Sequence, residues 1–344
     1  MNEIDTVTTV PDLAGKVAVG MRVPVRGRTT AEPGATTPPK ASERAARTGL
    51  WFTALAWGGS FVAARALLSP THAGETTLTP TVLAALRFGL ASLFFILPLG
   101  RAIARRAVTG GDLLRMAALG QITYAIYFWL QYTGVQRTSA GVASILVVGL
   151  TPLATAVMAR IMGRERLNGA SVVAFALGIM GVAMIVFQQG FQWRQNASFA
   201  LGAVCLIGNA ALFAVYSNLS KKWMRSVSPL VMTGGTMLSG ALGLLALSFV
   251  LDGSDKWARV GRLDSAQWAA LLFLTGACSI AAYLVYNRAL TRIDASRAAV
   301  YVYFEPVVAV ALGAALLNER LGIQAVAGAG IIALSVVLLQ RQKR

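Results

Sequence analysis

Long apolar runs separated by short polar segments constrain this chain more than any other feature. A helix of about 20 residues spans about 30 Å, the thickness of the hydrocarbon core of a bilayer. The runs are longer than barrel strands and lack the alternation that membrane β-barrels show. Helices are therefore expected, because each backbone polar group must be paired inside lipid. Ten spanning helices are predicted, at about 48–68, 80–100, 112–134, 139–160, 168–188, 198–220, 228–250, 266–290, 295–317 and 321–340.

The composition agrees with an all-α integral membrane protein. Hydrophobic residues make up 56% of the 344 residues and charged residues 13%. The formal net charge of +17 would suggest nucleic-acid binding in a soluble protein. Here the basic residues gather in the tails and in alternate loops, which predicts membrane orientation and no nucleic-acid partner. Most of them lie inside if both termini are cytoplasmic, although the predicted outer loop at 252–264 goes against this bias.

The two halves of the chain share a repeated pattern. Pro152 and Pro306 are 154 residues apart, and the same offset joins Tyr132 to Tyr286 and the Glu-Arg-Leu triplet at 165–167 to that at 319–321. A common register for three features indicates internal duplication. Five helices is an odd number, so successive copies enter the membrane in opposite senses, as in many secondary transporters. We therefore predict a disordered cytoplasmic tail at 1–47, whose start is either Met1 or Met21, and inverted repeats at 48–190 and 196–340.

The chain resembles a known family in these motifs. Two copies of an apolar run with a proline, an "ERL" turn and a glycine-rich helix, with "FEP" in the second copy, are similar to the EamA-type permeases of the drug/metabolite transporter superfamily. The resemblance covers about residues 48–340. It implies a secondary transporter in the cytoplasmic membrane that moves a small organic metabolite, such as an amino acid, a related compound or a drug-like solute, by alternating access and often outward.

Glu305 is the first candidate for binding chemistry. It lies about ten residues into its helix and so about 15 Å deep, near the middle of the bilayer. An ionised carboxylate there costs several kcal/mol unless it is paired, hydrated or protonated. Glu305 is expected to line the transport cavity and to bind a proton or a cationic group of the solute. The alternative is a structural role beside Pro306, where it would satisfy loosened backbone groups.

Arg87 is the second candidate, about 10 Å from the predicted outer edge of its helix. A buried arginine must find an anion, a carbonyl oxygen or water. Its planar guanidinium suits a carboxylate or a phosphate, and the resemblance points the same way, since many family members carry an arginine in this helix. A structural ion pair or a clamp on carbonyl oxygens is the competing interpretation.

Aromatic and polar side chains recur at helical spacing and could line a route for an organic solute. Packing between helices explains the same stripes equally well. The cavity candidates are Trp57, Tyr124, Asn209, Tyr283 and Tyr301. Gly235, Ser239 and Gly243 are spaced by four and predict a close helix contact. Glu165 and Glu319 are expected to be solvated residues, each capping the helix that follows it.

The sequence lacks the residues needed for metal binding, disulfide formation, a catalytic triad or ATP hydrolysis. The only histidine is His72, and Cys205 and Cys278 lie in apolar runs, so no metal site, disulfide or catalytic triad is predicted. The sequence has no phosphate-binding glycine loop, so ATP hydrolysis and other cofactor use are not expected. The alternatives to a transporter are an integral membrane enzyme acting on a lipid-linked substrate, and a channel or sensory membrane protein. The expected partners are a small solute and the bilayer, with proton coupling at Glu305.

Overall fold

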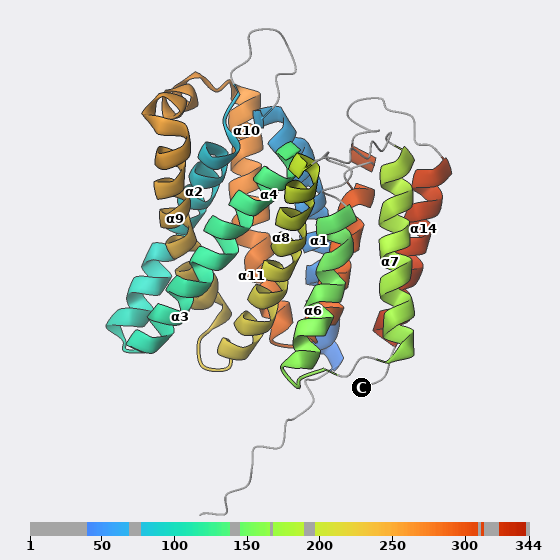
Figure 1. Ribbon diagram of the computed structural model, residues 1–344. Coiled ribbons are helices and arrows are strands. Elements are labelled where there is room, and N and C mark those ends of the chain that lie inside the picture. The colour runs from blue at the N-terminus through green and yellow to red at the C-terminus, as the bar shows by residue number, and fades with distance from the viewer. Residues whose placement is uncertain are drawn as a thin grey trace, which may run out of the picture. The chain divides into compact units, whose positions relative to one another are not determined.

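The computed structural model describes residues 40–68, 77–137, 145–165, 168–188, 197–308, 311–312 and 323–341. Within these ranges all regular structure is helical, and Figure 1 shows most of the helices running between the same two ends of a bundle. The elements are α1 (Lys40–Leu68), α2 (Pro80–Ala104), α3 (Gly110–Gly120), η1 (Gln121–Ile126), α4 (Tyr127–Arg137), η2 (Ile145–Gly149), α6 (Leu150–Ile161), α7 (Gly169–Gln188), α8 (Ala197–Trp223), α9 (Pro229–Trp257), η3 (Ala258–Arg262), α10 (Ser265–Phe273), η4 (Leu274–Ala281), α11 (Ala282–Leu290), α12 (Ala295–Ala299), η5 (Val300–Phe304) and α14 (Ile323–Arg341).

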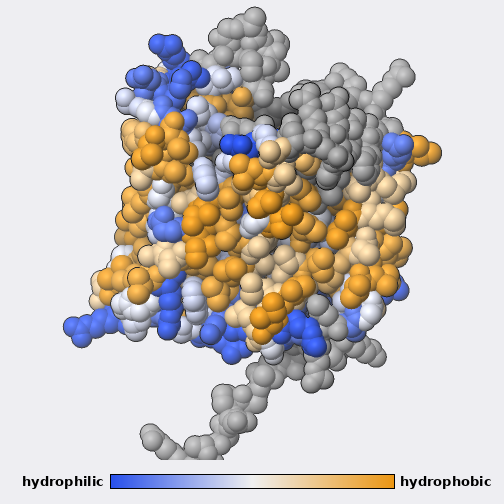
Figure 2. All heavy atoms as spheres, viewed as in Figure 1, coloured by the Kyte–Doolittle hydropathy of each residue, from blue (hydrophilic) through white to orange (hydrophobic). Residues whose placement is uncertain are grey.

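The helices have the length and surface of membrane spans. In the part of the chain that the structure describes, six are long and apolar enough to cross a bilayer: Glu43–Leu68, Pro80–Ala104, Gly110–Gln131, Ala197–Trp223, Pro229–Arg262 and Ser265–Leu290. Shorter apolar helices occupy Leu146–Ile161, Gly169–Met184 and Val326–Leu339. Figure 2 shows a broad belt of hydrophobic side chains between two hydrophilic ends. The predicted helical class is thus confirmed over the described residues, and its long apolar helices are consistent with a membrane protein, whereas the count of ten spanning helices, the inverted repeats and the domain bounds stay predictions.

Helix starts follow from local sequence. α2 and α9 each begin with a proline, preceded by Thr79 and Ser228, whose hydroxyls accept from a backbone N–H of the first turn. Thr109 with Asp112 and Asp264 with Gln267 form capping boxes at the starts of α3 and α10. α1 begins at Lys40, ahead of the span predicted from residue 48. The predicted tail before Lys40 lies outside the described residues.

Two long helices each contain a π-helical segment at corresponding places. η1 lies between α3 and α4, and η4 lies between α10 and α11. Shifted by the 154-residue offset of the sequence, η1 falls on 275–280, inside η4. A π-helical turn changes the backbone hydrogen bonding locally and is often found at functional sites. The apolar pattern alone predicted continuous helices here.

Glycines let the helices approach closely. A side-chain carbon added at Gly120 would lie 2.2 Å from the Thr236 carbonyl oxygen of α9, and one added at Gly181 would lie 2.7 Å from the Gly328 oxygen of α14. The close contact predicted for the spaced small residues of α9 is confirmed. Gly235 and Gly243 face Met116 and Gln121, and the Ser239 hydroxyl donates to the Ala117 oxygen at 2.9 Å. Lipid provides no hydrophobic effect to bring helices together, so close van der Waals packing of their backbones stabilises the contact instead.

Candidate functional site

Aromatic side chains from several helices meet in the interior of the bundle. The ring centroids of Trp57 and Tyr283 are 5.2 Å apart, those of Tyr283 and Tyr124 are 5.4 Å apart, and those of Tyr124 and Phe88 are 4.8 Å apart. Such edge-on and tilted pairs stabilise the contact beyond the apolar area that they bury. We name the set the aromatic cluster: Trp57, Phe88, Tyr124, Phe128, Phe213, Tyr216, Tyr283 and Tyr286.

Trp57 fixes α1 against the π-helical segment η4. Its Nε1 donates to the carbonyl oxygen of Cys278 at 3.0 Å, and the Cys278 Sγ lies 3.1 Å from the Ala56 oxygen. Both residues are buried. A side chain of another helix therefore binds a carbonyl oxygen of η4, where the π-helical turn changes the backbone hydrogen bonding.

Removing this donor tests its contribution to stability. Trp57→Phe keeps an aromatic ring but leaves the Cys278 oxygen without the indole, which is expected to lower the free energy of unfolding by about 1–3 kcal/mol. The unfolding temperature of the purified protein in detergent measures the change. The control is Trp268→Phe, because Trp268 of α10 is more exposed than Trp57. This variant should change the free energy of unfolding by less than about 0.5 kcal/mol. Equal effects of the two substitutions would contradict a special role for the Trp57 bond.

Arg87 of α2 lies at the edge of the aromatic cluster. Its Nε donates to the Ser279 Oγ of η4 at 2.7 Å, and its guanidinium carbon lies 4.8 Å from the centroid of the Phe88 ring. The residue is only 8% exposed. Among the described residues no carboxylate lies within ion-pair distance of the guanidinium. A buried cation with a single hydroxyl partner retains the capacity to bind an anion.

Glu305 directly follows η5 and is also 8% exposed. In the part of the chain that the structure describes, neither a hydrogen bond nor an ion pair reaches its carboxylate. α1 packs closely against this point, since a carbon added at Gly58 would lie 2.9 Å from the Glu305 backbone oxygen. Gly58 directly follows Trp57, so Glu305 packs against α1 beside a residue of the aromatic cluster, whereas Arg87 lies beside Phe88. Among the described residues these two side chains form no ion pair with each other.

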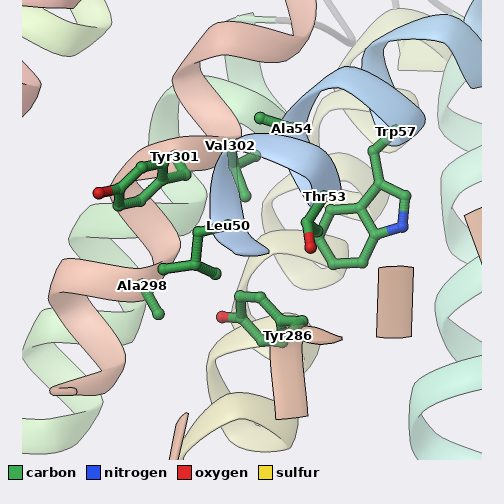
Figure 3. Close-up of a pocket in the computed structure, with 8 residues that line it drawn as sticks. All are labelled: Leu50, Thr53, Ala54, Trp57, Tyr286, Ala298, Tyr301 and Val302. Carbon is green, nitrogen blue, oxygen red and sulfur yellow. The ribbon is translucent and has the colours of Figure 1, made fainter. Parts of the chain in front are cut away.

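A narrow crevice continues from the cluster between α1, α11 and the α12–η5 segment. Figure 3 shows Trp57 and Tyr301 near opposite sides of this crevice, with Tyr286 below them. The crevice has no room for a water molecule, so its walls are in contact. A solute can occupy it only after these helices separate. The lining residues are Leu50, Thr53, Ala54, Trp57, Tyr286, Ala298, Tyr301 and Val302.

The sequence-predicted residues fall into four groups. Trp57, Tyr124 and Tyr283 lie in the aromatic cluster, and Arg87 and Glu305 lie beside it. Tyr301 lines the crevice, and its ring centroid lies 5.2 Å from that of Trp51, which is not part of the crevice lining.

Asn209 borders the aromatic cluster, since its partner Tyr127 has ring contacts with Phe128 and Phe213. Its side-chain amide donates to the Tyr127 backbone oxygen at 2.8 Å and joins α8 to α4. Sequence reasoning missed Thr53, although it lies one helical turn before Trp57 and therefore on the same face.

Comparison with known proteins supplies the functional context. The model of the EamA-like transporter family matches the chain twice, at residues 49–187 and 200–341. An uncharacterized transporter, YyaM of Bacillus subtilis, is 26% identical over 75% of this chain and 84% of its own length. A protein of Escherichia coli named a probable amino-acid metabolite efflux pump is 28% identical over 77% of this chain and 84% of its own length. A solved crystal structure with 18% identity superposes with a TM-score of 0.67 and covers 87% of this chain and 96% of the other, which shows a shared fold.

Proposed function

Because the chain belongs to the EamA-like transporter family, we propose that it is a secondary carrier of a small organic metabolite that works by alternating access. The names of the family and of its relatives indicate a membrane transporter rather than an enzyme. The carrier would lie in the cytoplasmic membrane with both termini inside. Its ten helices would form two inverted five-helix repeats, and the shared offset of the π-helical segments supports this plan.

The observation that carries the proposal is that two buried ionisable side chains of opposite sign, Arg87 and Glu305, border one aromatic cluster and form no ion pair with each other. Arg87 would bind the carboxylate of the solute, and Glu305 would bind a cationic group or a proton. The rings would pack against the solute's organic part. This arrangement suits an amino acid or a related compound, and the name of the E. coli relative, a probable amino-acid metabolite efflux pump, agrees with that class. Export is the proposed direction.

Transport in proteoliposomes tests the proposal. A panel of labelled amino acids and related metabolites is measured in both directions, with and without an imposed pH gradient, for wild type and Glu305→Gln. We expect saturable movement of at least one solute, accumulation against its gradient when protons are driven in wild type, and loss of that accumulation in the variant. Equal transport by both proteins would make Glu305 structural, and no saturable transport of any solute would overturn the carrier assignment.

A further inference from the structure

We infer that Glu165 closes one end of the transport route by a reversible contact with the start of α12. This inference rests on the proposed function. The Oε1 atom of Glu165 accepts from the Ala295 backbone N–H at 2.8 Å, and Oε2 accepts from the Ser296 hydroxyl. Glu165 belongs to the turn after α6, so the contact joins segments 130 residues apart in sequence. We call these three residues the latch.

The expected capping role of Glu165 toward the helix that follows it is wrong. The Asn168 Oδ1 accepts from the Ser171 backbone N–H at 2.8 Å and from its hydroxyl at 2.9 Å, and it thereby occupies the start of α7. The Glu165 carboxylate is instead free to reach the opposite half of the chain. Glu319, its sequence counterpart, lies outside the described residues.

Neighbouring contacts bring α8 to the same place. The Lys221 Nζ donates to the Ile293 oxygen at 2.8 Å and lies 3.2 Å from Asp294 Oδ1. The Arg164 guanidinium donates to the Asn218 oxygen at 3.2 Å. Figure 1 shows α6, α8 and α11 ending at the same end of the bundle, which the charge distribution predicts to be cytoplasmic. The turn between α11 and α12 is therefore held from both α6 and α8.

The latch lies directly beside the route proposed for the solute. Ala298, one turn beyond Ala295, is fully buried and lines the crevice, and Tyr301 and Val302 follow it. The same segment leads to Glu305. A solute leaving the aromatic cluster toward this end requires the segment to move away from α1 and α6. That movement breaks both hydrogen bonds of Glu165.

The chemistry of the latch makes it reversible. Glu165 is half-buried at the end of the bundle, so water can replace its two donors once the segment moves. An apolar contact packed in the bundle interior would have no such substitute. The latch is thus suited to a contact that forms and breaks in each transport cycle, whereas a static brace would remain closed throughout.

Closure is expected to take up protons. Burial raises the pKa of the Glu165 carboxyl above its usual range, and the nearby Asp294 raises it further, although the Ser296 hydroxyl, Lys221 and the Ala295 N–H oppose this effect. An opened, hydrated Glu165 regains its ordinary pKa. The closed form therefore binds a proton more tightly than the open form, so acid favours closure and a rise in pH through the raised pKa favours opening.

A reversible cross-link distinguishes a moving latch from a static brace. In the double variant Glu165→Cys/Ser296→Cys, a short reducible bifunctional thiol reagent, which spans the space left by the longer glutamate side chain, should cross-link the two positions and lower transport at least tenfold, and a reductant should restore it. The two single variants should not be cross-linked and should show no such reversible loss. Unchanged transport by the cross-linked protein would overturn the inference. Absence of transport in wild type under the same conditions would instead count against the proposed function.

A labelling assay tests the latch without any substrate. Ala298→Cys serves as the reporter, and its rate of reaction with a membrane-impermeant maleimide is measured in three further variants. Glu165→Ala should raise the rate at least fivefold, because the Ala295 N–H and the Ser296 hydroxyl lose their acceptor.

Glu165→Gln keeps an acceptor oxygen and should restore a slow rate, which changes with pH only as the thiolate fraction of the reporter thiol changes. Glu43→Ala, which removes a carboxylate paired with Arg47 on α1, is the control and should leave the rate unchanged. Equal rates in Glu165→Ala and Glu43→Ala would overturn the latch.

Discussion

Arg87→Met is expected to reduce saturable transport about a hundredfold while the protein remains folded. The pair concerned is the one that Arg87 is proposed to form with the carboxylate of the bound solute. Truncating one partner of a buried, hydrogen-bonded charge pair costs about 2–5 kcal/mol, and each 1.4 kcal/mol is about tenfold in affinity. The guanidinium has no ion-pair partner among the described residues, so its removal leaves no opposite charge stranded there. The Ser279 hydroxyl loses one hydrogen bond, which costs only about 1 kcal/mol, so the variant is expected to stay folded.

The comparison with Arg87→Lys sharpens this prediction. Lysine keeps the charge but loses the planar fork that binds a carboxylate through two hydrogen bonds. Its transport should lie between those of wild type and Arg87→Met. Initial rates in proteoliposomes measure transport, and the unfolding temperature in detergent measures stability. Transport by Arg87→Met at the wild-type rate would remove Arg87 from the binding site, and a large loss of stability with it would indicate a structural clamp instead.

Gly120→Ala is expected to give the largest loss of folded protein. The added carbon would lie 2.2 Å from the Thr236 carbonyl oxygen, which is backbone and cannot rotate away. α3 and α9 must then separate, and the neighbouring contact of Gly240 with the Gly120 oxygen and Tyr124 is lost with them. Overpacking of this kind costs about 1–3 kcal/mol or more. Monodisperse yield and unfolding temperature in detergent measure the effect.

Gly89→Ala provides the matched control. Gly89 lies on α2, and nothing lies within 4 Å of a carbon added there. Alanine is the better helix former by about 1 kcal/mol, so this variant should be as stable as wild type or more stable. Similar losses in Gly89→Ala and Gly120→Ala would show that the close approach of α3 to α9 does not limit stability.

The elements that sequence reasoning predicted are those set by local residues. The apolar runs predicted a helical membrane protein. Thr79-Pro80 and Ser228-Pro229 each combine an N-cap residue with a proline at the first helical position, which is a recognised signal for a helix start. The spacing of Gly235, Ser239 and Gly243 predicted a contact face because periodicity alone fixes which side chains share a face.

The remainder depends on partners distant in sequence. Ser279 as the partner of Arg87, and Ala295 as the partner of Glu165, lie 192 and 130 residues away. The π-helical segments lie within continuous apolar helices that pack against others. Their sequence has the same apolar pattern as the flanking α-helix, so the pattern does not predict them. The buried charges of Arg87 and Glu305 could be recognised one by one. Their approach to one aromatic cluster follows only from how the helices pack.

Counterflow in proteoliposomes tests the central claim, a carrier with one site open to each side in turn. Vesicles preloaded with unlabelled solute receive a trace of the same labelled solute outside, with wild type and Arg87→Met compared. For wild type we predict that preloading accelerates uptake, so that labelled solute inside the vesicles transiently exceeds its equilibrium level. The reason is that the carrier's site returns to the outside loaded with unlabelled solute, which it releases there. The variant should show no such excess. Uptake that neither saturates nor responds to preloading would contradict the carrier account and indicate a channel.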